Sequence, residues 1–188
     1  MILGPKGGAM AERLRGGEAI TLGEIFSFLS GLYFRGKLAY ASRFAETGHV
    51  LVITPHQGLL PAATPLSLPE LESFSTAAID AEDEAYRRPL EIDLIAWAER
   101  KEIGRFIFLG SLASGKYVDI LREFLGERLF FPVPFLGRGN LSRGSLLLRQ
   151  AEAGVEMEYA PIAELVRERG TTSTAPGRGG MSSRRKRR

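Results

Sequence analysis

The pattern in this sequence that most suggests a chemical site is a glycine-rich turn that ends in lysine. Gly110, Gly115 and Lys116 fit G-x-x-x-x-G-K, and Ser111 follows the first glycine. The amides of such a turn, together with the lysine ammonium, can surround a phosphate as in a P-loop. Tyr117 stands where a P-loop has the Ser or Thr that binds magnesium, and a phenol is too long and rigid for that role. Three interpretations stay open: a tight turn with a solvated lysine, an anion site without hydrolysis, and a nucleotide-binding P-loop.

A second glycine-rich loop, at residues 137–144, adds cationic and polar groups. It contains Arg138, Asn140 and Arg143 among three glycines. Each arginine can hold a phosphate or carboxylate through paired hydrogen bonds, and the glycines let the backbone approach a ligand closely. A mobile surface loop with two solvated arginines is the alternative. We expect three further cations on the same rim of the fold: Arg35, Lys37 and Lys116.

Two residues are candidates for moving protons. His56 follows an apolar run at residues 50–53 and can act as an acid, a base or a hydrogen-bond donor, or simply satisfy backbone carbonyls at a strand end. Asp80 opens an acidic cluster that can activate water, although such clusters often mark the start of a helix. We therefore name His56 and Asp80 as candidate catalytic residues and Tyr33 as a candidate contact for a base or sugar. No His, Asp or Glu set repeats at metal-ligand intervals, so the sequence predicts no metal site.

Composition limits the class of protein. The 188 residues are 44% hydrophobic, which is enough for one core, and there is no cysteine for disulfides, thiol chemistry or thiolate metal sites. No apolar run approaches the roughly 20 residues that span a bilayer, and no signal peptide is evident. We expect a soluble, cytoplasmic protein that needs no cofactor.

Charge is unevenly distributed along the chain. Residues 167–188 contain eight basic residues and one acid, a net charge of +7, whereas the whole chain carries +3, so the remainder is acidic at −4. The high isoelectric point therefore belongs to the tail and does not indicate a basic face on the folded body. We expect a flexible arm at residues 1–19, one domain at 20–169 and a disordered basic tail at 170–188, which can bind a polyanion or have no specific partner.

The elements expected from apolar patterning alternate between strand and helix. Strands are predicted at about 24–31, 50–53, 106–109, 129–131 and 155–159. Helices are predicted at about 37–46, 79–101 with an interruption at Pro89, 146–153 and 161–169, and one more opens in the Gly110–Tyr117 turn, before Gly126. Such alternation predicts an α/β fold: a mostly parallel sheet of four to five strands with helices on both faces, a Rossmann-like three-layer sandwich. Its strand-end edge would bring both glycine-rich loops together.

The order of these segments resembles a known group of domains. Tyr33, Tyr40 with Ala41, the Gly58-Leu59 turn, the Gly110–Tyr117 turn and the glycine-rich loop at 137–144 are similar to features of uncharacterised bacterial α/β domains related to the archaeosine synthase core domain. That group has a uracil-DNA-glycosylase-like fold. The resemblance covers residues 24–150 and implies that fold and a nucleobase or nucleotide ligand. It does not imply base excision, because the water-activating motif of the glycosylases is not recognisable.

Together these patterns predict a protein that binds a nucleotide, a nucleobase or a nucleic-acid end. Lys116, Arg138 and Arg143 would hold anionic groups, and Tyr33 and His56 would contact a base or sugar. If the protein is an enzyme, it would act on a glycosidic or phosphate bond. The alternatives are a non-catalytic adaptor that engages nucleic acid or a protein partner through its rim or tail, and a P-loop nucleotide-binding protein.

Overall fold

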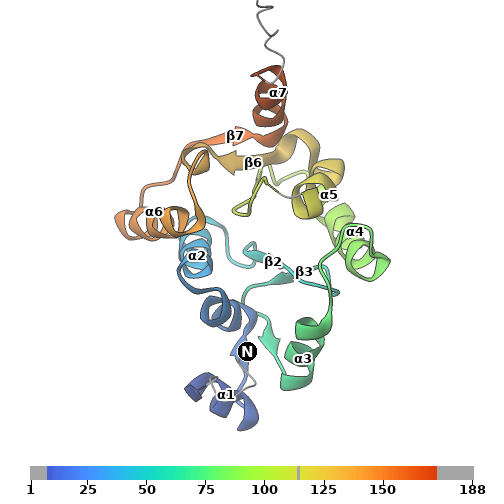
Figure 1. The fold of residues 1–188 in the computed structure, drawn as a ribbon, viewed down its shortest axis with the longest axis vertical. Helices are drawn as coiled ribbons and strands as arrows, with labels where there is room; N and C mark the ends of the chain where they lie inside the picture. The colour runs from blue at the N-terminus through green and yellow to red at the C-terminus, as the bar shows by residue number, and fades with distance from the viewer. Residues whose placement is uncertain (1–7, 114, 173–188) are drawn as a thin grey trace, which may run out of the picture.

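The structure, a computed structural model, describes residues 8–113 and 115–172, and this part of the chain is mainly helical (Figure 1). The helices are α1 (Gly8–Arg15), α2 (Leu22–Phe44), α3 (Leu68–Thr76), α4 (Glu84–Glu99), α5 (Gly115–Leu125), α6 (Asn140–Ala153) and α7 (Ile162–Thr172). Two 3-10 turns, at Gly126–Arg128 and Val133–Phe135, flank β6. The strands are β1 (Ile20–Thr21), β2 (Leu51–Ile53), β3 (Leu59–Pro61), β4 (Pro65–Leu66), β5 (Phe106–Ile107), β6 (Leu129–Pro132) and β7 (Tyr159–Pro161).

The strands form three small sheets, so the predicted α/β sandwich with a mostly parallel sheet of four to five strands is wrong. β1 pairs with β4 and β2 with β3, both antiparallel, and the largest sheet has the order β5-β6-β7. Only β5 and β6 are parallel within the described residues. The predicted strand, turn and helix of residues 106–125 are present as β5 and α5, and α5 leads back to β6 as expected of a parallel connection.

Residues 24–31, predicted as a strand, lie inside α2. Thr21 caps this helix: its hydroxyl accepts a hydrogen bond from the Glu24 amide, and the Glu24 carboxylate accepts one from the Thr21 amide. Glycine interrupts the helix at Gly31, whose φ of 64° and ψ of −145° are outside the helical region. α2 therefore consists of two helical halves that meet at a kink.

The fully buried hydrophobic residues of the two halves of α2 belong to different hydrophobic clusters. Ile25 in the first half packs with residues of α1, β1, β4 and α3, near one end of the molecule. Tyr40 in the second half packs with residues of α4, α5, β6, α6 and α7 toward the other end (Figure 1). The β2-β3 hairpin lies between them, and its alternate side chains face different clusters: Val52 the first, Ile53 the second. Both faces of β2 are thus covered by apolar residues, although β2 belongs to an antiparallel hairpin and not to a parallel sheet.

The second half of α2 lies against α6 at very short range (Figure 1). A Cβ added to Gly36 would come within 2.6 Å of the Gly144 carbonyl oxygen, and one added to Gly144 within 2.9 Å of the Tyr33 Cα. Only glycine permits this approach, because the obstructing atoms are backbone. The crossing brings the first turn of α6 next to the kink of α2.

Both ends of the described chain also differ from expectation. Residues 8–15, part of the predicted flexible arm, form α1, whose Ala11 and Leu14 are buried. Helix α7 continues to Thr172. Residues 1–7 of the arm and 173–188 of the predicted basic tail lie outside the described residues.

Candidate functional site

A cavity of about 280 Å³ opens where the α2 kink meets the start of α6. Its walls are apolar and aromatic with a few polar groups, and its lining residues are Ser30, Leu32, Tyr33, Phe34, Lys37, Asn140 and Leu141. None of these described lining residues is acidic. We refer to this site as the α2–α6 cavity.

Tyr33 fixes one wall of the α2–α6 cavity to the rest of the protein. Its hydroxyl donates to the carbonyl oxygen of Leu109 at 2.8 Å, and the Gly110 carbonyl lies 3.3 Å away. Its ring meets that of Phe135 edge to face. Burial raises the pKa of Tyr33, and the neighbouring Arg143 opposes part of that increase. Tyr33 thus connects α2 to the turn after β5 and remains a neutral phenol at ordinary pH.

Lys37 lies one helical turn beyond Tyr33, and its Nζ is 4.1 Å from the centre of the Tyr33 ring. The side chain is partly buried, and it has no ion pair with any described residue. Burial, together with the positive charge of Arg143, lowers the pKa of Lys37 from 10.5 to about 8. The amine is therefore still mainly cationic at neutral pH, in a cavity wall that offers it no counter-charge.

Arg143 stands beside this pair without lining the cavity. Its Nε donates to the Phe135 carbonyl at 3.2 Å, and its guanidinium lies 5.3 Å from the Phe135 ring centre and 5.9 Å from that of Phe131. It too has no ion pair among the described residues. Two positively charged side chains, Lys37 and Arg143, are thus held next to one cavity, and their charge favours an anionic ligand.

The start of α6 reinforces this positive potential. Gly139 precedes the helix without a side-chain cap, and no acidic residue occupies the first turn. The amides of the first turn therefore have no intrahelical partner, whereas the Arg143 amide bonds to the Gly139 carbonyl. Asn140 and Leu141 of this turn line the cavity.

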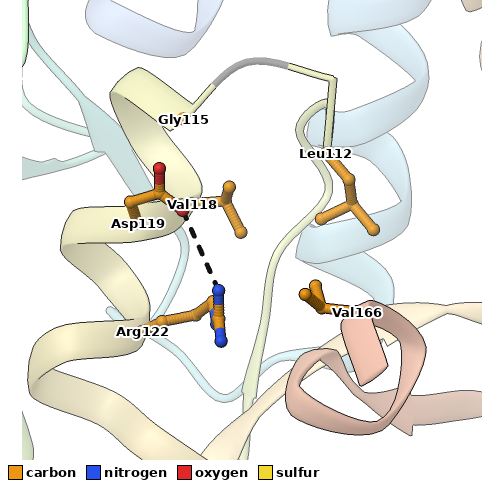
Figure 2. Close-up of a pocket in the computed structure, with 6 residues that line it drawn as sticks. All are labelled: Leu112, Gly115, Val118, Asp119, Arg122 and Val166. Carbon is orange, nitrogen blue, oxygen red and sulfur yellow. Dashed lines mark ion pairs between the residues drawn. The ribbon is translucent and has the colours of Figure 1, made fainter. Parts of the chain in front are cut away.

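A second cavity of the same size, about 280 Å³, lies between α5 and α7 (Figure 2). It is lined by Leu112, Gly115, Val118, Asp119, Arg122 and Val166. Asp119 and Arg122 form an ion pair at 3.9 Å, and the Asp119 carboxylate lies directly against Gly115, where a Cβ would be. We refer to it as the α5–α7 cavity; its one cation already has an anionic partner.

The described part of the turn from Gly110 to Lys116 borders the α5–α7 cavity through Leu112 and Gly115. The ring of Phe108 covers the face of Gly110, and the Ser111 hydroxyl accepts a hydrogen bond from the Ala113 amide. The ammonium of Lys116 lies 5.1 Å from the centre of the Tyr117 ring. Ser114 is outside the described residues. In the described part of this turn, the observations favour a tight turn over a P-loop.

The predicted cationic rim is therefore divided. Tyr33, Asn140 and Arg143 come together at the α2–α6 cavity, and Gly110 contributes only a carbonyl oxygen near the Tyr33 hydroxyl. Arg35 is on the opposite side of α2 from Tyr33, since successive helical residues are about 100° apart. Arg138 is exposed and donates to the Ser142 hydroxyl at 3.1 Å.

The two predicted proton carriers lie apart from this cavity's lining. His56 is in the turn between β2 and β3, where its ring meets that of Phe74 edge to face and its Nδ1 is buried without a described partner. Asp80 is exposed and accepts a hydrogen bond from the Glu82 amide. No hydrogen bond joins His56 to Asp80 among the described residues, and no described group of three or more His, Asp and Glu residues could hold a metal.

Sequence patterning did not single out most of the cavity wall. Lys37 was expected on the rim, but its pairing with Tyr33 follows from the i, i+4 spacing once this segment is known to be helical. The remaining wall residues, Ser30, Leu32, Phe34 and Leu141, have no signal in the sequence, because the kink at Gly31 and the crossing of α2 with α6 bring them together.

Comparison with known proteins gives no further guidance: no family model, no curated protein and no solved structure matches this chain. Within residues 8–113 and 115–172, none of the helices is long and apolar enough to cross a membrane.

Proposed function

We propose that this protein binds a nucleotide, or the phosphorylated end of a nucleic acid, in the α2–α6 cavity. The observation on which this depends is the convergence of Lys37 and Arg143, neither of them paired with a described carboxylate, beside a cavity with aromatic walls. The phosphate would lie between the Lys37 ammonium and the first turn of α6, with Arg143 adding charge from behind. The base or sugar would pack on the apolar wall formed by Leu32, Phe34 and Leu141.

An anion with an apolar portion suits the charge and the size of this cavity. A cation in a partly buried site costs solvation, and an anionic ligand offsets that cost. Free amides at a helix start add donors of the correct polarity. The cavity is smaller than most sites for drug-sized ligands, and it suits a single nucleotide rather than a dinucleotide.

We propose that the cavity binds its ligand, and we treat a reaction at a glycosidic or phosphate bond as a secondary hypothesis. His56 and Asp80, the predicted proton carriers, are not part of the cavity wall. A non-catalytic adaptor is the second candidate, and one observation favours it: Leu141, at the rim of the cavity, is 74% exposed. An apolar side chain this accessible beside a cationic site suits contact with a larger partner.

Calorimetric titration with adenosine 5′-monophosphate, adenosine and inorganic phosphate tests the proposal. We expect the nucleotide to bind more tightly than either part alone and to raise the melting temperature. Lys37→Met should weaken nucleotide binding by about tenfold or more, because a charge-assisted hydrogen bond is lost. Lys101→Met is the matched control, since Lys101 is exposed and donates only to the Ala98 carbonyl.

Two outcomes would count against this function. Equal loss of affinity in Lys37→Met and Lys101→Met would mean that binding is unspecific attraction to positive charge. Binding of oligonucleotides, but not of the mononucleotide, that disappears when residues 173–188 are removed would favour the adaptor instead. Salt dependence separates these cases further, because a polyanion on a basic tail dissociates steeply as salt rises.

A further inference from the structure

We propose that Lys37 is a nucleophilic lysine that forms an imine with a phosphorylated aldehyde bound in the α2–α6 cavity. This proposal depends on the proposed function in one respect, because it places the ligand's phosphate in the same cavity; the phosphate lies at the first turn of α6 and Arg143, and Lys37 faces the carbonyl group instead of the phosphate. It goes further by naming a covalent step and the class of compound that undergoes it.

The position of Lys37 meets the geometric needs of an amine nucleophile. Its side chain lines a cavity, so a carbonyl carbon can approach the Nζ, and the Tyr33 ring, 4.1 Å from the Nζ, keeps one side apolar. The titratable groups that face it are Tyr33 on its own helix and Arg143 on α6. Neither is an anion, so nothing described there holds the lysine in its protonated form.

The surroundings of Lys37 favour the unprotonated amine that such a reaction requires. With a pKa of about 8, about a tenth of the amines are free at pH 7, against well under one in a thousand for a lysine at 10.5. Desolvation and a neighbouring cation are the two means by which proteins activate lysine as a nucleophile. Both operate on Lys37: burial is the larger cause and the charge of Arg143 the smaller.

The second requirement is a group that holds the aldehyde in place. The first turn of α6, with Asn140 and Leu141 at the cavity wall, presents unbonded amides, and Arg143 adds positive charge. A phosphate bound there would leave the carbonyl end of a short ligand facing Lys37. Holding the two reacting groups together raises the effective concentration of the aldehyde.

The chemistry is a condensation without any change of oxidation state. The Nζ lone pair attacks the carbonyl carbon, and a proton moves from nitrogen to oxygen to give a carbinolamine. Loss of water then leaves a C=N bond between Lys37 and the ligand. The amine and the aldehyde are the only reactants, and one molecule of water is the only other product.

Reductive trapping tests this proposal on the unaltered full-length chain. The protein is incubated with pyridoxal 5′-phosphate, reduced with sodium cyanoborohydride and digested, and labelling of each lysine is quantified by peptide mass spectrometry. We expect Lys37 to be labelled at least about tenfold faster than Lys101 or Lys116, with a rate that rises from pH 6.5 to 8.5. Relative to Lys101, unphosphorylated pyridoxal should label Lys37 much less than the phosphorylated probe does, and inorganic phosphate should slow labelling of Lys37 by the phosphorylated probe.

Two further arms make the test decisive. 2-Deoxyribose 5-phosphate, a sugar aldehyde, should also be trapped on Lys37 in preference to Lys101. Lys37→Arg should abolish the fast labelling, whereas Lys101→Arg should retain it. Labelling spread evenly over Lys37, Lys101 and Lys116, or equal labelling by pyridoxal with and without phosphate, would overturn the proposal. If adenosine 5′-monophosphate binds but no Lys37 adduct forms, the covalent step fails while the proposed function stands.

Discussion

The α2–α6 and α5–α7 cavities are equal in volume, at about 280 Å³, but differ in charge balance. In the first, Lys37 and Arg143 have no ion pair among the described residues, and none of the described lining residues is acidic. In the second, Arg122 is paired with Asp119, whose carboxylate lies against Gly115 (Figure 2). The glycine-lysine pattern in the sequence belongs to the second cavity, but the unbalanced positive charge is at the first.

The comparison shows that a motif for anion binding is not sufficient when the protein supplies its own anion. The Asp119 carboxylate lies against Gly115, where a Cβ would be, and so places a negative charge beside the glycine-lysine turn. At the α2–α6 cavity the helix start has no acidic residue in its first turn. Charge balance, rather than the number of glycines or lysines, therefore distinguishes a candidate binding site from a structural turn.

The largest effect should follow from separating α2 from α6. Gly36→Ala would place a methyl group within 2.6 Å of the Gly144 carbonyl oxygen, and backbone cannot move aside cheaply. We expect the free energy of unfolding to fall by about 2–3 kcal/mol, after allowance for the better helix propensity of alanine. Chemical denaturation measures this change, and the increase in melting temperature with adenosine 5′-monophosphate should also disappear.

Gly104→Ala is the control for Gly36→Ala, because a Cβ at Gly104 meets nothing within 4 Å. It should change the free energy of unfolding by less than about 0.5 kcal/mol. A Gly36→Ala protein as stable as the Gly104→Ala protein would show that α2 and α6 do not pack as closely as described, and the α2–α6 cavity would lose its basis.

Some of this architecture was evident in the sequence, and the reasons for the failures are specific. The segment from β5 to β6 was predicted because its apolar runs are short and bounded by glycine or polar residues. The prediction of a strand at residues 24–31 is wrong because aromatic and branched residues suit a buried helix as well as a strand. The Thr21 and Glu24 spacing, a capping box, was the signal that would have indicated a helix.

The site could be predicted only in part for a related reason. Tyr33, Asn140 and Arg143 were identified by residue type, yet the sheet edge expected to assemble them is absent from the described residues. The glycines Gly36 and Gly144 bring α2 and α6 together, and such a contact between residues about a hundred positions apart has no local pattern. His56 follows a strand, β2, as the sequence predicts, but its grouping with Asp80 depends on chemistry alone, and no hydrogen bond joins the two among the described residues.

A smaller effect, on binding alone, should appear with pH. Lys37 has its positive charge below a pKa of about 8 and loses it as pH rises through that value, so nucleotide affinity should fall above pH 8. Since a phosphate monoester is already mainly dianionic above pH 7, the change between pH 7 and 9.5 reports Lys37 rather than the ligand. We expect a decrease of about tenfold by calorimetry. In Lys37→Met the profile should be flat, and an equally steep profile in that variant would assign the titration to another group.

The smallest effect is expected from a substitution in the α5–α7 cavity, where the charges are balanced. Asp119→Asn removes the anion that balances Arg122, but the pair is 3.9 Å apart and the Asp119 side chain is 69% exposed. Exposed ion pairs of this kind contribute little, so the free energy of unfolding should change by less than about 0.5 kcal/mol. Nucleotide affinity should not change, because Lys37 and α6 are unaffected. If Asp119→Asn instead raised nucleotide affinity about tenfold in a Lys37-independent manner, the Asp119 carboxylate would be the occupant that keeps phosphate out of the glycine-lysine turn. One substitution would then leave Arg122 without its counter-charge and open the turn to phosphate. The α5–α7 cavity would be the stronger candidate for the anion site.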